Sequence, residues 1–148
     1  MKIVTFYLLD QHVIKHGLIT MERLACNLAI LHWRAGKRVL IACENNEQAR
    51  KLDNALWTQT TAAFIPHNLV GEGPQDGAPI EISWPHRRCN VPRDLIISLI
   101  PTCTDFAFSC HEVIDFVPNE EYLKQLARKR YKAYRSVGFQ LITAQPPP

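Results

Sequence analysis

The sequence predicts a single α/β domain in which helices flank a central, mostly parallel β-sheet. Apolar runs of strand length occur at 3–9, 38–43 and 94–100. They are too dense for simple alternation, which is typical of strands covered on both faces. Segments with helical spacing of apolar residues separate the first runs. This β-α-β-α order favours parallel strands joined by right-handed crossovers.

The first helix is predicted to begin near Thr20, a residue type suited to the N-cap, and to end at Gly36. Its apolar face is predicted to contain Leu24, Leu28 and Leu31, which recur at helical spacing. Alanines beside this stripe broaden the face that packs on the sheet. The first crossover is therefore expected to run through this helix.

A second helix is predicted over 47–57, and its inward stripe does not include Trp57, which lies about 100° from Leu56 around the axis. If the next segment is a strand, Phe64 and Ile65 point to opposite faces. Two interpretations of these aromatic residues stay open. Trp57 laps over the core, or Trp57 and Phe64 together form an exposed docking patch.

The middle of the chain is rich in loops, with short strands predicted at 80–84 and 113–117 and a helical turn at 105–110. The glycine-rich loop at 71–77, GEGPQDG, carries two acidic residues, the wrong charge for holding phosphate. We therefore predict an ordinary loop there. The chain from about 140 to 148 ends in three prolines and is predicted to be a flexible tail.

The helix predicted between Asn119 and Gly138 has both ends marked by suitable residues. Asn119 suits the N-cap, and Gly138 suits the left-handed position beyond the last turn. At about 100° per residue, one face of this helix gathers four cations around one tyrosine ring. The members of this face are Lys124, Arg128, Tyr131, Lys132 and Arg135. It is either an anion site with an aromatic wall or an ordinary solvated face.

Arg130 is the exception on this helix, because it falls on the side that packs. The other members of the packed side are Leu123, Leu126, Ala127, Ala133, Tyr134 and Val137. A guanidinium on this packed side is expected to need an acidic partner or a route to water.

The composition is that of an ordinary globular protein: 148 residues, 47% hydrophobic, 21% charged, with a net charge of +3. This mild positive charge is weak support for direct binding of nucleic acid. The cysteines form no CxxC pair, so Cys26 and Cys43 are expected to be core thiols. No apolar run approaches the length of a membrane span. We expect one domain, residues 1–148, in the reducing cytoplasm and without a membrane partner.

No constellation typical of catalysis appears in the sequence. The dinucleotide-binding fingerprint, the GxxxxGK[ST] loop and the GxSxG elbow are absent. Asp10, His12 and His16 share one loop, but loop histidines of this kind are usually plain surface residues. We therefore expect no enzyme activity, no metal and no cofactor. A cryptic nucleotide-dependent enzyme with its site near Asp10 and Glu44 is kept as an alternative.

Five segments, in order and almost end to end, resemble the chi subunit of bacterial DNA polymerase III. They are TFYLLD (5–10), WRAGKRVLIACE (33–44), FIPHNLVGEGPQDGAPIEISWP (64–85), RDLIISL (93–99) and DFVPNEEYLKQLARKRYKAYRSVGF (115–139). The resemblance implies a Rossmann-like fold. It also implies a non-enzymatic accessory subunit of the clamp-loader assembly that acts in DNA replication.

The resemblance further implies two protein partners. One is the psi subunit of the clamp loader, whose contact matches Trp57 and Phe64. The other is the acidic, phenylalanine-ending C-terminal tail of single-stranded DNA-binding protein. The positions that match the tail site are Val117, Lys124, Arg128, Tyr131 and Lys132. A helicase that competes for the psi surface is left open by the resemblance.

The resemblance therefore implies that this chain contacts nucleic acid only indirectly. The residues alone also allow a direct nucleic-acid-binding protein, which would use the long cationic helix and the basic loop before the strand at 94–100. The arginines of that loop are Arg87, Arg88 and Arg93.

Overall fold

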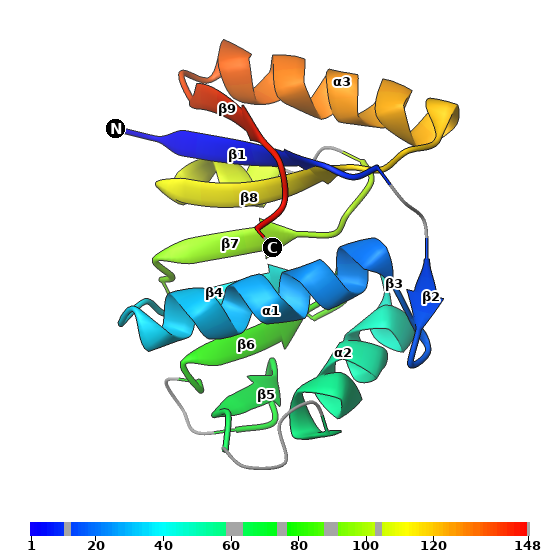
Figure 1. Ribbon diagram of the computed structural model, residues 1–148. Helices are drawn as coiled ribbons and strands as arrows, with labels where there is room; N and C mark the ends of the chain where they lie inside the picture. Colours follow the sequence, from blue (N-terminus) through cyan, green and yellow to red (C-terminus); the bar gives the residue numbers. More distant parts are fainter. Residues whose placement is uncertain (11–12, 59–63, 74–76, 88–91, 103–104, 148) are drawn as a thin grey trace.

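The computed structural model describes residues 1–147 apart from 11–12, 59–63, 74–76, 88–91 and 103–104 (Figure 1). The strands of its main sheet are β1 (Ile3–Leu8), β4 (Val39–Ala42), β5 (His67–Leu69), β6 (Ile80–Ser83), β7 (Leu95–Ser98), β8 (Glu112–Val117) and β9 (Gln140–Ala144). They form a seven-stranded sheet in the order β5-β6-β4-β7-β8-β1-β9. Every neighbouring pair is parallel. The predicted α/β fold is confirmed.

Helices cover both faces of the sheet. They are α1 (Thr20–Arg34), α2 (Asn46–Thr58), the 3-10 helix η1 (Asp105–Ser109) and α3 (Glu121–Ser136). A small hairpin of β2 (Ile14–Lys15) and β3 (Leu18–Ile19) precedes α1. No helix in the described ranges is long and apolar enough to cross a membrane.

Alternate residues of each central strand face different helices. In β4, Val39 and Ile41 belong to the core cluster under α1 and α2, whereas Leu40 and Ala42 belong to the cluster that contains Tyr134 of α3. All four residues of β4 are buried. This two-sided burial is the reason that the strands are continuous apolar runs in the sequence.

The start and the last turn of α1 differ from the prediction. Ile19, rather than Thr20, is the N-cap. The Thr20 hydroxyl instead accepts a hydrogen bond from the backbone N–H of Val13, 3.0 Å away, and Glu22 accepts one from the N–H of Ile19 at 3.1 Å. Leu31, predicted on the apolar face, is 57% exposed. The predicted helical spacing is right, but its last member, Leu31, lies beyond the edge of the core.

The start of α3 is also displaced. Glu120 is the N-cap, while the Asn119 side chain donates from Nδ2 to the carbonyl of Asp10 at 2.9 Å. Asn119 therefore ties the entry of α3 to the end of β1 instead of capping the helix. Gly138 has the predicted left-handed conformation, with φ of 95°. Val137 was predicted to pack but is 44% exposed at the end of the last turn.

The expectation of a flexible tail from residue 140 is wrong for 140–144, which form β9 beside β1. The N–H of Gln140 donates to the carbonyl of Lys2 at 2.8 Å. Phe139 is buried against the rings of Phe108 and Tyr134 just before the strand. Pairing with the edge of β1 and burial of Phe139 thus order residues 140–144, although the terminal prolines favoured a flexible tail.

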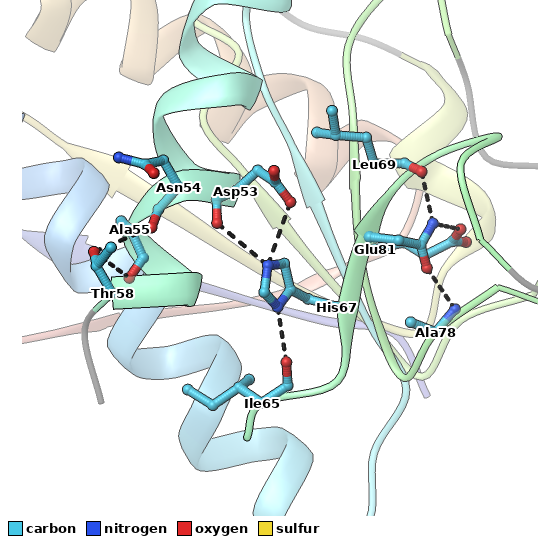
Figure 2. Close-up of polar contacts among 10 residues, drawn as sticks. Asp53, Asn54, Ala55, Thr58, Ile65, His67, Leu69, Ala78 and Glu81 are labelled. Atoms are coloured by element: carbon cyan, nitrogen blue, oxygen red, sulfur yellow. Dashed lines mark hydrogen bonds and ion pairs between the residues drawn. The ribbon is translucent and has the colours of Figure 1, made fainter. Parts of the chain in front are cut away.

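A buried polar network lies beside Gly77, at the end of the loop predicted at 71–77. The Asn68 side chain donates from Nδ2 to Oε2 of Glu81 at 2.9 Å and accepts from the N–H of Ala78 at 2.8 Å. Figure 2 shows these contacts around Glu81 and Ala78. Arg93 forms an ion pair with the other oxygen of Glu81, and both side chains are buried. Gly77 lies directly against this pair, with φ of 76°.

The cysteine thiols described by the structure lie in the core, as predicted for Cys26 and Cys43. Burial, and then the negative charge of Glu22, raise the pKa of Cys26 to about 12. Burial also raises the pKa of Cys43. Both thiols therefore stay protonated and serve as small apolar groups.

Arg130 has an acidic partner, as expected for a guanidinium on the packed side of α3. Its Nε donates to Oδ2 of Asp115 at 2.9 Å, and its Nη2 donates to Oδ1 of Asp115 at 3.2 Å and to the carbonyl of Phe116 at 2.9 Å. Its Nη1 donates to the carbonyl of Pro101. Both charged side chains are buried. One guanidinium thus joins α3 to β8 and to the segment that follows β7.

We predict that Gly77→Ala destabilises the protein more than Gly36→Ala. Both glycines have positive φ, 76° and 92°, so alanine at either position costs about 1–2 kcal/mol of backbone strain. A Cβ at Gly36 meets nothing within 4 Å, whereas one at Gly77 would lie 2.6 Å from Nη2 of Arg93. That clash should add about 1–3 kcal/mol. Equal free energies of unfolding in urea would contradict the packing described.

We predict that Arg130→Met lowers the free energy of unfolding by about 3–5 kcal/mol, because it leaves a buried carboxylate without its partner. Burial raises the pKa of Asp115 above its usual range, and Arg130 opposes that rise. Without Arg130 the pKa rises further. A carboxyl that binds its proton more tightly when folded loses stability as pH rises through the interval between its unfolded and folded pKa.

The deficit of Arg130→Met should therefore shrink as pH is lowered, and the double variant with Asp115→Asn should be more stable than Arg130→Met alone. Urea unfolding at several pH values measures both effects. A deficit independent of pH would show that Asp115 does not carry the charge opposite Arg130.

Candidate functional site

A small apolar pocket lies where α3 passes the end of β8. Its volume is about 290 Å³, and it is lined by Val117 of β8 and by Lys124, Ala127, Arg128 and Tyr131 of α3. The helical residues follow the spacing i, i+3, i+4 and i+7, which places them on one face. We call this feature the helix pocket. It brings together four of the five residues predicted for a tail-binding site.

Tyr131 forms a fixed wall of the helix pocket. Its ring is half-buried and packs against Phe6 of β1, with 5.5 Å between ring centroids. Val117 is half-buried on the same side of the sheet. Ala127 is buried and forms part of the lining, whereas helical periodicity predicted it only for the packed face. The small alanine leaves the space that the flanking side chains enclose.

Cations border the apolar walls. Lys124 is half-buried, and Arg128 is exposed with Nη1 3.8 Å from Oε1 of Glu121. Both partners of that ion pair are at least two-thirds exposed, so the contact holds Arg128 weakly. Lys132 and Arg135 are exposed on the same helix but do not line the pocket. The predicted cationic face is therefore present, and only its first half surrounds a cavity.

Trp57 and Phe64 form a second surface, on α2 and the segment that follows it. Trp57 is 57% exposed and Phe64 is 69% exposed, and their ring centroids are 5.9 Å apart. Ile65 is only 2% exposed, so the neighbouring residues do point to opposite sides. The structure thus selects the exposed interpretation over the one in which Trp57 covers the core. We call this pair the aromatic patch.

A buried histidine, which no pattern in the sequence distinguishes from the other histidines, supports the aromatic patch. Figure 2 shows the His67 ring between Ile65 and Asp53. Its Nδ1 is 2.7 Å from the carbonyl of Ile65, and its Nε2 is 3.2 Å from the carbonyl of Asp53 and 3.3 Å from its Oδ1. The Trp57 ring stands edge-on to it, 4.8 Å between centroids. Burial raises the pKa of Asp53, and His67 opposes the rise.

The carboxyl ends of β4 and β7 border a cavity of about 360 Å³, the usual place for a ligand in such sheets. Glu22, Glu44, Glu47 and Asp115 contribute to its lining, and the two cations that also line it, Lys51 and Arg130, are paired with Glu22 and Asp115. Carboxylates are unsuited to hold a nucleotide phosphate. No group of three or more His, Cys, Asp or Glu side chains in the described ranges could hold a metal ion. Asp10, the other residue of the enzyme alternative, is exposed outside this cavity.

The basic loop considered for nucleic acid is largely engaged with the protein itself. Arg93 is paired with Glu81. Arg87 lies 3.6 Å from Glu72 and over the ring of Trp84, 5.3 Å from its centroid. Arg88 lies outside the described residues. The two arginines that can be placed therefore do not form a free cationic strip of the kind that follows a nucleic-acid backbone.

Comparison with solved structures supports the fold. The crystal structure of T4 UvsW is similar with a TM-score of 0.64 at 11% sequence identity, covering 99% of this chain and 42% of that one. At this identity the similarity concerns the fold alone.

Comparison of sequences is more specific. The family model for the DNA polymerase III chi subunit, HolC, matches residues 1–142. DNA polymerase III subunit chi of Escherichia coli is 56% identical over 144 residues, which is 97% of this chain and 98% of the relative. The subunit of the same name from Haemophilus influenzae is 45% identical over 142 residues, 96% of each chain. This chain therefore belongs to the family of DNA polymerase III chi subunits.

Proposed function

We propose that this chain is a non-catalytic adaptor of the replisome, which links the clamp loader, through the psi subunit, to the acidic C-terminal tail of single-stranded DNA-binding protein. The observation that carries the proposal is the helix pocket, where cations surround a cavity with apolar walls. Such a pocket fits a ligand that has carboxylates and one apolar group. An acidic tail that ends in phenylalanine has this chemistry.

In this arrangement the terminal ring of the tail enters the cavity between Tyr131 and Val117, over Ala127. Lys124 and Arg128 meet the terminal carboxylate and the acidic side chain nearest to it, in charge-assisted hydrogen bonds. Lys132, outside the cavity, meets carboxylates further from the end of the tail. Exposed ion pairs contribute only about 0.2–1 kcal/mol each. Burial of the ring is therefore the source of selectivity.

The aromatic patch is the proposed contact with psi. Trp57 and Phe64 are large, exposed and in mutual contact, which is typical of the apolar anchors that dominate protein interfaces. The buried His67 ring contacts the Trp57 ring edge-on, so part of the anchor is already packed before the partner arrives. A helicase could compete for the same surface, because an exposed aromatic pair does not select psi by its own chemistry.

We predict that Trp57→Ala or Phe64→Ala weakens association with psi by about 2 kcal/mol or more, because each removes an interface anchor. Binding of the tail peptide should be unchanged in both variants. Isothermal titration calorimetry with purified psi and with the peptide measures the two affinities. Tyr122→Ala is the matched control, since Tyr122 is also a surface aromatic, 64% exposed, but lies on α3. A variant that unfolds would show that its residue belongs to the core and not to an interface.

We predict that the helix pocket separates the effects of charge and of the ring. Raising the salt concentration should weaken binding of the natural tail peptide by screening Lys124 and Arg128. Removing the terminal phenylalanine should weaken binding further at every salt concentration. Arg128→Ala should lower the salt dependence, and Tyr131→Ala should abolish the advantage of the natural peptide over the truncated one.

Fluorescence anisotropy with labelled peptides measures these affinities, and Lys129→Ala is the control for loss of one exposed charge on α3. The unfolding midpoint of Tyr131→Ala must be recorded, because the ring also packs on Phe6. The proposal fails if a scrambled peptide of equal charge, without a terminal aromatic residue, binds as well as the natural tail.

A further inference from the structure

A further concave surface lies apart from the helix pocket, between the β2–β3 hairpin, the first turns of α1 and the exposed side of α2. Its volume is about 590 Å³. Leu18 and Ala55 contribute apolar walls, and none of the described lining residues is acidic. We call it the basic cavity because four basic side chains line it. They are Lys15, His16, Arg23 and Lys51.

The positive charge of the basic cavity is only partly balanced by the protein. Lys51 lies 3.4 Å from Oε1 of Glu22. Arg23 donates from Nη2 to the carbonyl of Val13 at 3.3 Å, whereas its buried Nε has no hydrogen-bond partner among the described residues. Within the same ranges, neither Lys15 nor Arg23 forms an ion pair with a carboxylate. An anion that enters the cavity would supply the missing charge.

The hairpin also places a histidine at the cavity. His16 and Gly17 form its turn, with φ of 56° and 79°. Two-residue turns with two positive φ values match the twist of a hairpin, and histidine is one of the residue types that are enriched at positive φ. The imidazole adds a further hydrogen-bonding group to the same wall.

The basic cavity continues from the aromatic patch along α2. Lys51 and Asn54 line the cavity, and Trp57 follows Asn54 by three residues, which is about 60° around the helix. Figure 2 shows Asn54 beside Thr58, which also lines the cavity. Ile14 on the hairpin is 68% exposed. A chain that is anchored on Trp57 can therefore follow α2 to the cavity.

We propose that the basic cavity binds an acidic peptide segment of the partner that docks on the aromatic patch. The identity of that partner as psi rests on the proposed function, but the acidic chemistry rests on the cavity alone. Carboxylates of the segment would pair with Lys15 and Arg23, while its apolar side chains would lie on Ile14 and Trp57. The aromatic anchor would give affinity, and the cavity would fix the direction in which the segment runs.

A peptide fits these observations better than a nucleic acid. Single-stranded nucleic acids bind along grooves in which cations follow the phosphate backbone. Here the cations converge on one concavity with apolar residues at its rim, which suits a few carboxylates projecting from a folded or extended peptide.

The test measures binding of purified psi to the full chain by isothermal titration calorimetry at low and at moderate salt. The variants are Lys15→Glu, Arg23→Gln and, as the matched charge control, Lys129→Glu on α3. Lys15 is exposed in the hairpin, so its variant is expected to fold normally, and urea unfolding checks each protein. Lys15→Glu and Arg23→Gln should weaken binding about tenfold or more and flatten its salt dependence. Lys129→Glu should bind as the unchanged protein does.

The inference and the proposed function fail in different ways. If Trp57→Ala loses psi but Lys15→Glu and Arg23→Gln bind normally at both salt concentrations, the cavity is not part of the interface and the inference is overturned. If psi does not bind the unchanged protein, the proposed psi contact fails. The cavity is then tested with a hexaglutamate peptide and a dodecathymidylate oligonucleotide.

Three results of that second titration are decisive. Peptide binding that is lost in Lys15→Glu and retained in Lys129→Glu supports the inference without psi. Absence of peptide binding overturns it. Binding of the oligonucleotide that is tighter than that of the peptide and is lost in Lys15→Glu also overturns it, in favour of a nucleic-acid site.

Discussion

The buried ion pair between Arg130 and Asp115 is the contact on which the helix pocket depends. A single guanidinium bonds to β8, to the backbone at Phe116 and to Pro101 after β7, so it fixes both the height and the rotation of α3 on the sheet. Tyr131 is the next residue, and its wall of the pocket follows from that rotation. The pair is costly to desolvate, which suggests that it is more important for the orientation of α3 than for net stability.

Much of this architecture could be predicted because a strand that is buried on both faces is a continuous apolar run in the sequence, as in 38–43. In addition, helical spacing identified α3 and its cationic side. The wrong predictions arose where a side chain had two possible positions that the local sequence favours about equally. Asn119 could cap α3, but a distant carbonyl holds its side chain. Periodicity also does not show where a helix extends beyond the edge of its sheet. Leu31 was therefore wrongly predicted to lie on the buried face of α1. The basic cavity joins residues of three separate elements, so no spacing along the chain reveals it.

The two proposed protein contacts lie far apart in the fold. α3 covers one face near β8, β1 and β9, whereas α2 covers the other face near β5 and β6 (Figure 1). Two partners could therefore be bound together without touching the same residues. A parallel sheet with both faces buried is a stiff connection, and a stiff connection suits a bridge between assemblies better than a switch.

The position of β1 has a consequence for the order in which the protein is made. β1 is the first strand of the chain, but its neighbours in the sheet are β8 and β9, whose residues leave the ribosome last among the strands. The strands β4, β5, β6 and β7 can pair among themselves earlier. Until β8 and β9 have been made, Val4 and Phe6 have no neighbouring strand to pair beside, and a nascent chain with such an exposed apolar strand is prone to aggregate.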